Sequence, residues 1–305
     1  MSEQFEMVAW PDLETPVLVV ALGGWIDAGN GAQAAMELLD IQLDAQVSVR
    51  FDGDTFIDYR ARRPTMRLIE GINADLVWPE IVLKSAKDRQ GHGVLLLMGA
   101  EPDTSWHRFA DIVASLAIDL DVRMMVGLGA YPYAAPHTRP SRLSVTASSP
   151  DLAAGMAVQR STLDVPAGIE SVLEQALADK GIPTIGLWAQ VPHYVANVPY
   201  PAASLALLEG LSQLTGVVTD QAGLQAAARD HQQRLDELVA NSEEHTTMVR
   251  QLEQAWQLEA AEAAAQAGGA DGSEPLSGFG LQADNLPSGD DLAAELERFL
   301  RDQGR

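Results

Sequence analysis

The first residues that could do chemistry lie in LGGWIDAGNG, a glycine-rich loop directly after the apolar run VLVVA. This loop carries Gly24, the carboxylate of Asp27 and the amide of Asn30, at a place where α/β proteins often bind a phosphate on a helix N-terminus. Its spacing fits neither G-x-G-x-x-G nor G-x-x-x-x-G-K-[ST], and it contains no lysine that could reach a phosphate. Asp27, or Asn30 together with Gln33, can instead cap the helix that follows. The pattern therefore favours a structural turn over a phosphate site.

A second polar group follows the apolar run RMMVGLG, in the proline-rich loop AYPYAAPHTRPS. His137, Thr138 and Arg139 offer an imidazole, a hydroxyl and a guanidinium, a set that can bind an anion or a carboxylate. The alternative is that they tie the loop to nearby carbonyl groups and acidic side chains. Because the carboxyl ends of parallel strands share one end of a sheet, this loop can meet the glycine-rich loop. If the two loops meet, they form a possible ligand-binding site.

Two further stretches are candidates for contact with another protein. The segment GLWAQVPHYVANVPYPAA combines aromatic residues with prolines; such rigid aromatic loops are common at interfaces, although core packing explains them equally well. The stretch SGDDLAAELERFLRD predicts a short amphipathic helix whose apolar stripe must be covered. The possible interface residues are Trp188, Tyr194, Tyr200, Leu292, Leu296 and Phe299. The arginine-rich run DYRARRPTMR is a local positive patch that can recruit an acidic segment or stay solvated.

Composition narrows the classes of function. The 305 residues include no cysteine, and the six histidines form no H-x-x-x-H or H-E-x-x-H pair, so thiol chemistry and a metal site lack support. A G-x-S-x-G nucleophile elbow is also missing from the sequence. We therefore expect no catalytic residues, no metal and no cofactor. The net charge of -23 disfavours nucleic acid and anionic membranes as partners, and the acidic N-terminus lacks a secretion signal, which predicts a cytoplasmic protein.

The pattern of the chain up to about residue 216 predicts the scaffold that positions these residues. Short β-rich runs alternate with helical runs, and several strand candidates are continuously apolar, as in a sheet covered on both faces. The expected fold class is α/β, a three-layer sandwich with a mostly parallel sheet. The strand candidates are 16–22, 45–51, 80–86, 93–99, 123–129, 142–148 and 183–190, and the helix candidates are 31–43, 105–120, 167–180 and 202–214.

The character of the sequence changes after residue 218. Residues 219–266 contain no proline and repeat apolar residues at three- and four-residue spacing, which predicts one long helix or a helical hairpin. The Gly/Ser/Asp-rich stretch 267–290 predicts a flexible linker, and 291–305 is the amphipathic C-terminal helix. The expected organisation is an α/β domain over 1–218 followed by a helical extension, which packs on its own body or on a neighbouring subunit.

Four stretches together carry a likeness to a known family: PVLVVALGGWIDAGNGA, LMGAEPD, GLGAYPYAAPHTRP and GIPTIGLWAQVPHYVA. Over roughly residues 8 to 215 the chain resembles the actinobacterial branch of the proteasome assembly chaperone superfamily, the relatives of the second assembly-chaperone subunit. The resemblance implies an α/β sandwich similar to the nucleoside phosphorylase fold, a helical C-terminal extension, and self-association into oligomers, with a trimer as one candidate. Archaeal relatives dock on the proteasome through a terminal hydrophobic-Tyr-any motif. This sequence ends in RDQGR, so we do not expect it to use that mode.

Two functions of different classes follow from these observations. The first is a non-enzymatic protein-interaction or assembly-chaperone-like protein with an unidentified protein partner, for which proteasome subunits are one candidate. It rests on the family likeness, on the uncovered apolar stripe and on the missing catalytic motifs. The alternative is a small-molecule binding protein or enzyme with its site between the 23–31 and 131–142 loops. The likeness supports the fold more than the activity, because function depends on sites rather than on folds.

Overall fold

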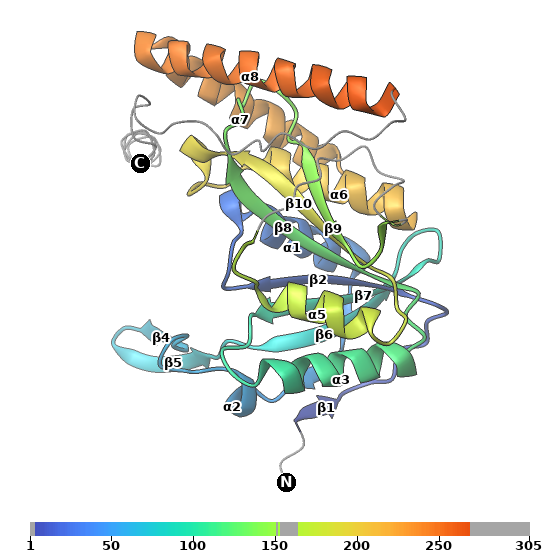
Figure 1. The fold of residues 1–305 in the computed structure, drawn as a ribbon. Helices are drawn as coiled ribbons and strands as arrows, with labels where there is room; N and C mark the ends of the chain where they lie inside the picture. Colours follow the sequence, from blue (N-terminus) through green and yellow to red (C-terminus); the bar gives the residue numbers. More distant parts are fainter. Residues whose placement is uncertain (1–3, 151, 153–163, 269–305) are drawn as a thin grey trace.

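The computed structural model describes residues 4–150, 152 and 164–268, and these form a three-layer α/β sandwich (Figure 1). Its middle layer is an eight-stranded sheet in the order β1-β3-β6-β7-β2-β8-β10-β9, and β4 and β5 form a separate two-stranded sheet. The strands are β1 (Phe5–Met7), β2 (Val17–Gly23), β3 (Gln46–Phe51), β4 (Thr65–Ile69), β5 (Ile72–Val77), β6 (Ile81–Lys87), β7 (Gly93–Ala100), β8 (Met124–Tyr133), β9 (Leu143–Ala147) and β10 (Thr184–Pro192). The helices are α1 (Gly31–Leu43), α2 (Gly53–Phe56), α3 (Trp106–Asp119), α5 (Ile169–Ala178), α6 (Pro201–Thr215), α7 (Ala222–Ala240) and α8 (Glu243–Gly268), with short 3₁₀ turns η1 (Ala28–Asn30) and η2 (His193–Val195).

The centre of the large sheet is parallel and its flanks are antiparallel. Strand β2 pairs in parallel with β7 and β8, and β8 pairs in parallel with β10. Strand β9 on one side, and β6, β3 and β1 on the other, add antiparallel pairs. The predicted α/β sandwich is therefore confirmed, and its sheet is mixed with a parallel centre. The carboxyl ends of the four parallel strands lie together, at the end of the sheet where α/β proteins usually bind ligands.

Both faces of the sheet are buried, which explains the continuously apolar strands. In β2, Val17 and Val19 pack into the core beneath α1 and α6, while Leu18 and Val20 pack into the opposite core beneath α3 and α5. Successive side chains of a strand point to opposite faces, so a strand covered on both sides must be apolar at every position. All seven expected strands and all four expected helices are present, with ends that differ by a few residues. Strand β8 extends furthest, to Tyr133, and takes in the start of the expected 131–142 loop.

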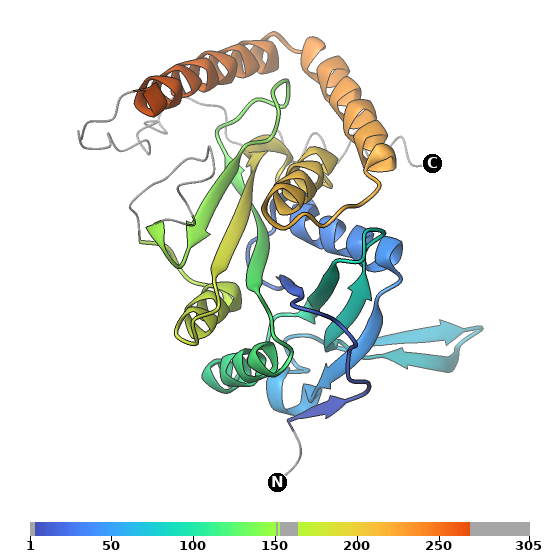
Figure 2. The same cartoon turned by 90° about the vertical axis from the view of Figure 1, so that its right-hand side faces the viewer.

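Residues 219–266 form two helices, α7 and α8, joined at Asn241 and Ser242. Both helices lie outside α6 (Figures 1 and 2), and Leu235 of α7 and Val249 of α8 are buried in the same core as α1 and α6. The helical extension therefore packs on the body of its own chain. None of the described helices is long and apolar enough to cross a bilayer. The predicted C-terminal helix, with Leu292, Leu296 and Phe299, and most of the predicted linker lie outside the described residues.

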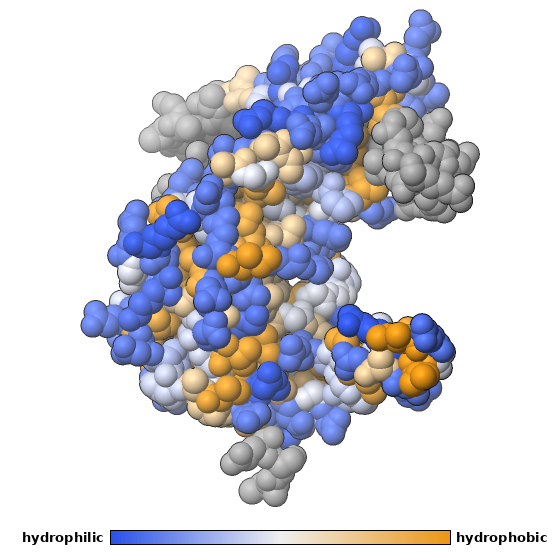
Figure 3. All heavy atoms as spheres, turned by 180° about the vertical axis from the view of Figure 1, so that it is seen from behind, coloured by the Kyte–Doolittle hydropathy of each residue, from blue (hydrophilic) through white to orange (hydrophobic). Residues whose placement is uncertain are grey.

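The β4–β5 hairpin projects away from the body (Figure 2), and the sequence did not predict it. Nearly every side chain of the two strands is exposed, so no alternation of buried and exposed positions marks them in the sequence. Apolar side chains nevertheless gather on the hairpin and at its base, as Figure 3 shows. The exposed apolar residues there are Met66, Leu68, Ile69, Ile72, Val77 and Trp78.

Candidate functional site

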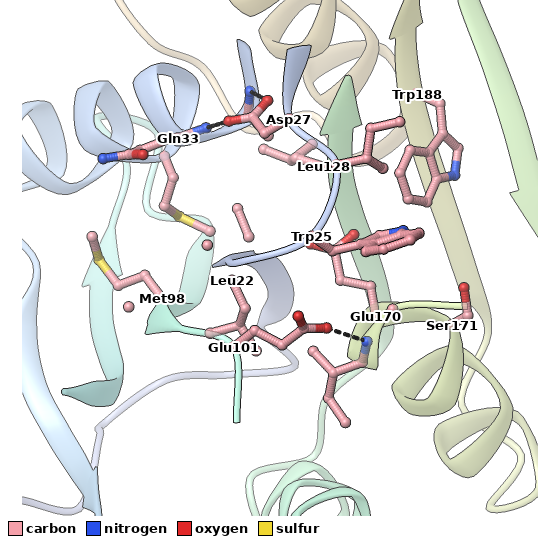
Figure 4. Close-up of a pocket in the computed structure, with 18 of the residues that line it drawn as sticks. Leu22, Trp25, Asp27, Gln33, Met98, Glu101, Leu128, Glu170, Ser171 and Trp188 are labelled. Carbon is pink, nitrogen blue, oxygen red and sulfur yellow. Dashed lines mark hydrogen bonds between the residues drawn. The ribbon is translucent and has the colours of Figure 1, made fainter. Parts of the chain in front are cut away.

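A pocket of about 240 Å³ opens at the carboxyl end of the parallel strands (Figure 4). Strands β2 and β8 separate there: their pairing stops at Val20 and Gly127 and resumes only as an isolated bridge between Asp27 and Ala130. The pocket is bounded by the ends of β2, β7, β8 and β10 and by the first turns of α1 and α5. Its walls include apolar, aromatic and acidic side chains: Leu22, Met36, Met98, Leu128, Trp25, Trp188, Asp27, Glu37, Glu101 and Glu170. Among its described lining residues there is no lysine or arginine.

Asp27 closes the N-terminus of α1. One of its carboxylate oxygens accepts a hydrogen bond of 2.8 Å from the backbone N–H of Ala32, and the other accepts one of 2.9 Å from that of Gln33. Burial nevertheless raises the pKa of Asp27, because desolvation outweighs these bonds. Asn30 makes no capping bond with its side chain and adopts a left-handed conformation with φ of 50°. Of the two caps that the sequence allows, Asp27 is therefore the one used, and it occupies the place a phosphate would take.

Glu101 closes the second helix N-terminus at the pocket. Its side chain is 7% exposed, and it accepts a hydrogen bond of 2.8 Å from the backbone N–H of Ile169, the first residue of α5 (Figure 4). An anion at either helix would have to displace one of the protein's own carboxylates. The geometry thus excludes the usual phosphate-binding arrangement at this end of the sheet.

Glu170, next along α5, lines the same pocket, as does Leu22 near the end of β2, where β2 has left β8. Burial, together with the negative charge of nearby Glu174, raises the pKa of Glu170 well above its ordinary value of 4.5. Burial also raises the pKa of Glu174, which accepts a hydrogen bond from Thr146. Two partly buried carboxylates one helical turn apart therefore share this side of the sheet, and charging both is unfavourable.

Glycines in the strands make room for these side chains. A Cβ atom at Gly127 would lie 3.3 Å from a carboxylate oxygen of Glu170, and one at Gly129 would lie 2.3 Å from the ring of Trp188. A Cβ atom at Gly186 would lie 2.4 Å from Glu174. Glycine inside a strand weakens it and often marks a close approach by another group. Gly127 and Gly129 therefore leave room for the pocket residues Glu170 and Trp188, and Gly186 leaves room for Glu174, one turn further along α5.

The glycine-rich turn is also filled by the protein itself. A Cβ atom at Gly24 would lie 2.1 Å from the guanidinium of Arg62, which donates to the carbonyl of Gly23 and to the carboxylate of Asp103. The space beside Gly24 therefore holds a side chain from the positive patch of residues 58–67. At the other end of the turn, Gly29 donates to the carbonyl of Ala196 at 2.7 Å. These contacts give the turn an architectural role.

The second polar loop lies against the helical extension rather than at the pocket. The ring of His137 contacts the hydroxyl of Tyr194 at 2.7 Å and the carboxylate of Asp236 at 3.2 Å. Glu253 of α8 accepts a hydrogen bond from Thr138 at 2.6 Å and lies 3.9 Å from the guanidinium of Arg139. None of these three loop residues is among the described residues that line the pocket. The structure thus gives Asp27 and the 137–139 group separate partners, and the loop ties the body to α7 and α8.

The predicted aromatic interface residues are placed differently from one another. Tyr194 and Tyr200 are each 4% exposed and lie in the core beneath α6, so their rings are not on the surface of this chain. Trp188 is partly exposed, donates to the hydroxyl of Thr146 at 3.2 Å and lines the pocket. Only Trp188 of these three therefore offers a ring to a ligand or partner.

Sequence reasoning missed the pocket residue Glu170, and Glu174 one turn further along α5, because acidic residues near a helix start are usually explained by capping. Their four-residue spacing places them on one side of α5, next to the buried face formed by Ile169 and Leu173. The glycines of β8 and β10 were a second available signal, since they mark where a side chain crosses the sheet closely. Within the part of the chain that the structure describes, no group of three or more His, Asp or Glu residues could hold a metal ion.

Comparison with known proteins identifies the family of this chain. Residues 21–239 match the profile of the PAC2 family. A Mycobacterium tuberculosis protein of unknown function is 33% identical, with a TM-score of 0.81, covering 88% of this chain and 93% of its own. A Mycobacterium tuberculosis proteasome-assembly chaperone homologue is also 33% identical, with a TM-score of 0.71 and coverage of 76% and 99%.

A PAC2 family protein from Streptomyces avermitilis is 34% identical, with a TM-score of 0.69 and coverage of 77% and 99%. No curated protein sequence matches the chain significantly. The resemblance noted in the glycine-rich turn and in the two loops is confirmed by these matches, which extend well beyond those motifs. The chain therefore belongs to the PAC2 family.

Proposed function

We propose that this protein acts without catalysis, as an assembly-chaperone-like protein that holds another protein, with proteasome subunits as the first candidates. The family supports this proposal, because a 33% identical relative is a proteasome-assembly chaperone homologue. The glycine-rich turn is filled by the protein's own side chains.

The observation that carries the proposal is the projecting β4–β5 hairpin. Ile72 is 71% exposed, Leu68 is 59% exposed and Ile69 is 57% exposed. A two-stranded hairpin without a covered face is only marginally stable in water, and its free strand edges favour pairing with another chain. Apolar surface gathered on such an element marks a contact with another protein. The same surface serves self-association, which the family likeness implies.

The test uses cross-linking followed by affinity capture with proteasome α- and β-subunits from the source organism. The variant Ile72→Asp places a charge on the hairpin and should remove the cross-linked partner. The matched control is Ile41→Asp, because Ile41 is 78% exposed on α1, away from the hairpin. Size-exclusion chromatography with light scattering reports self-association of the same variants. Recovery of no partner by the wild-type protein, or equal losses in both variants, would contradict the proposal.

A further inference from the structure

We propose that the pocket at the carboxyl end of the sheet binds a linear aliphatic diamine or polyamine. Such a ligand carries ammonium groups separated by methylene chains. This small-molecule site is separate from the hairpin and goes beyond the protein contact proposed above.

The acidic side chains that line the pocket favour a positively charged ligand. Asp27 lies on the α1 side, and Glu101 and Glu170 lie on the α5 side (Figure 4). No described lysine or arginine lines the pocket to neutralise them. Arg62 donates to the carbonyl of the lining residue Gly23, and its charge is paired with that of Asp103. Burial raises the pKa of Asp27 and of Glu170, because an ionised carboxylate is unfavourable away from water, and a bound cation would stabilise the ionised forms. Both helix N-termini are already capped by Asp27 and Glu101, which excludes an anionic ligand.

The spacing of the carboxylates selects an extended cation over a metal ion. Apolar side chains line the pocket beside the acidic groups: Leu22 and Met98, which Figure 4 labels, and Met36. No three acidic or histidine residues of the described chain converge on one point as metal ligands would. A methylene chain can pack on these apolar side chains while its terminal ammonium groups reach the carboxylates. Burial of apolar area and charge-assisted hydrogen bonds would then both stabilise the bound ligand.

Aromatic rings complete the site. Trp25 is 53% exposed where it lines the pocket, and the indole of Trp188 lines the wall formed by β10. Ammonium groups bind favourably over indole faces. The wall is built into the fold: Gly129 leaves the space that Trp188 fills, and Gly127 leaves the space beside Glu170. These two strand glycines therefore distinguish the pocket wall from an ordinary acidic surface.

The test is titration of the full chain with spermidine by isothermal calorimetry and by thermal unfolding. Because a ligand that binds the folded state stabilises it, spermidine should raise the melting temperature saturably. Octane-1,8-diol has a chain of the same length without charge and should have no effect. Magnesium tests for simple screening of the net charge of -23 and should give a smaller, non-saturating change.

Substitutions locate the site. Glu170→Gln keeps the shape of the side chain but cannot ionise beside a bound ammonium group, and it should weaken spermidine binding about tenfold or more, as expected for losing a charge-assisted hydrogen bond. Glu244→Gln removes a carboxylate exposed on α8 and should leave the affinity unchanged. Circular dichroism establishes that both variants fold. No saturable shift with spermidine, an equal shift with magnesium, or equal weakening in the two variants would overturn the proposal.

Discussion

Glu101, in the loop between β7 and α3, accepts a hydrogen bond of 2.8 Å from the backbone N–H of Ile169, 68 residues further along the chain. This bond occupies the N-terminus of α5 with the protein's own negative charge. Asp27 does the same for α1 through Ala32 and Gln33. The end of the sheet that usually accepts phosphate therefore carries acidic groups in this protein, and its chemistry favours cations.

The helix cap formed by Asp27 gives a first prediction. Asp27→Ala removes the acceptor of two backbone N–H groups of α1 and should lower the free energy of unfolding by about 1 kcal/mol, the typical value of an N-terminal cap. Asn30→Gly is the control, because Asn30 makes no capping bond and its φ of 50° suits glycine. Urea unfolding measures both. A control as destabilised as Asp27→Ala would show that Asp27 is not the cap.

Glu170 should make stability depend on pH. Its native pKa lies well above the ordinary 4.5, so the folded chain holds this proton to higher pH than the unfolded chain. The group therefore costs stability as the pH rises from about 4.5 through the raised native pKa. Glu170→Gln removes this cost, so its stability relative to the wild-type protein should grow over that window.

The measurement is urea unfolding of the wild-type protein and Glu170→Gln between pH 4 and pH 9. Glu244→Gln removes a carboxylate at an exposed position on α8 and serves as the matched control. Glu174, Asp27 and Glu101 act on Glu170 through their charges and remain in all three proteins. A difference for Glu170→Gln that stays constant or shrinks with rising pH would contradict the assignment.

The glycine beneath Trp188 gives a third prediction. Gly129→Ala places a methyl group 2.3 Å from the indole ring and should destabilise the fold by about 1–3 kcal/mol, as overpacking does. Near-ultraviolet circular dichroism should also change, because the ring must move. Gly223→Ala in α7 meets nothing within 4 Å and should gain up to about 1 kcal/mol from helix propensity. Similar losses in both variants would show that the contact with Trp188 is not the cause.

The attachment of α8 gives a fourth prediction. Arg142 donates to the carboxylate of Glu259 at 3.2 Å and to the carbonyl of Trp256 at 3.0 Å, and its guanidinium lies 3.8 Å from the centre of the Trp256 ring. Arg142→Ala should weaken this attachment by about 1–3 kcal/mol and speed hydrogen exchange in α8 while leaving α1 unchanged. Lysine should restore it only partly, because it lacks the planar fork.

Hydrogen–deuterium exchange with mass spectrometry measures this effect by segment. Arg250→Ala changes an exposed arginine of α8 and serves as the control. Faster exchange in both variants, or across the whole chain, would show that Arg142 does not attach α8 specifically.

Sequence alone determined the layers of this protein. The continuously apolar run at Val17–Val20 requires burial on both faces, and the helix over Gly31–Leu43 was predicted to its first and last residue. The sequence also showed that the catalytic motifs considered are missing, and it showed the family likeness. The β4–β5 hairpin was not, because exposed strands leave no periodic signal of burial.

Only the tertiary structure decided which polar residues share a site. The sequence allowed Asp27 to share a site with His137 and Arg139, since both loops follow strands whose ends could meet. In the structure β8 continues to Tyr133 and carries the second loop to α7 and α8, where His137 contacts Asp236 and Arg139 lies beside Glu253. Asp27 instead shares its pocket with Glu101 and Glu170. Local patterns report burial and turns, whereas the meeting of distant side chains depends on how far each strand runs and on which face each helix covers.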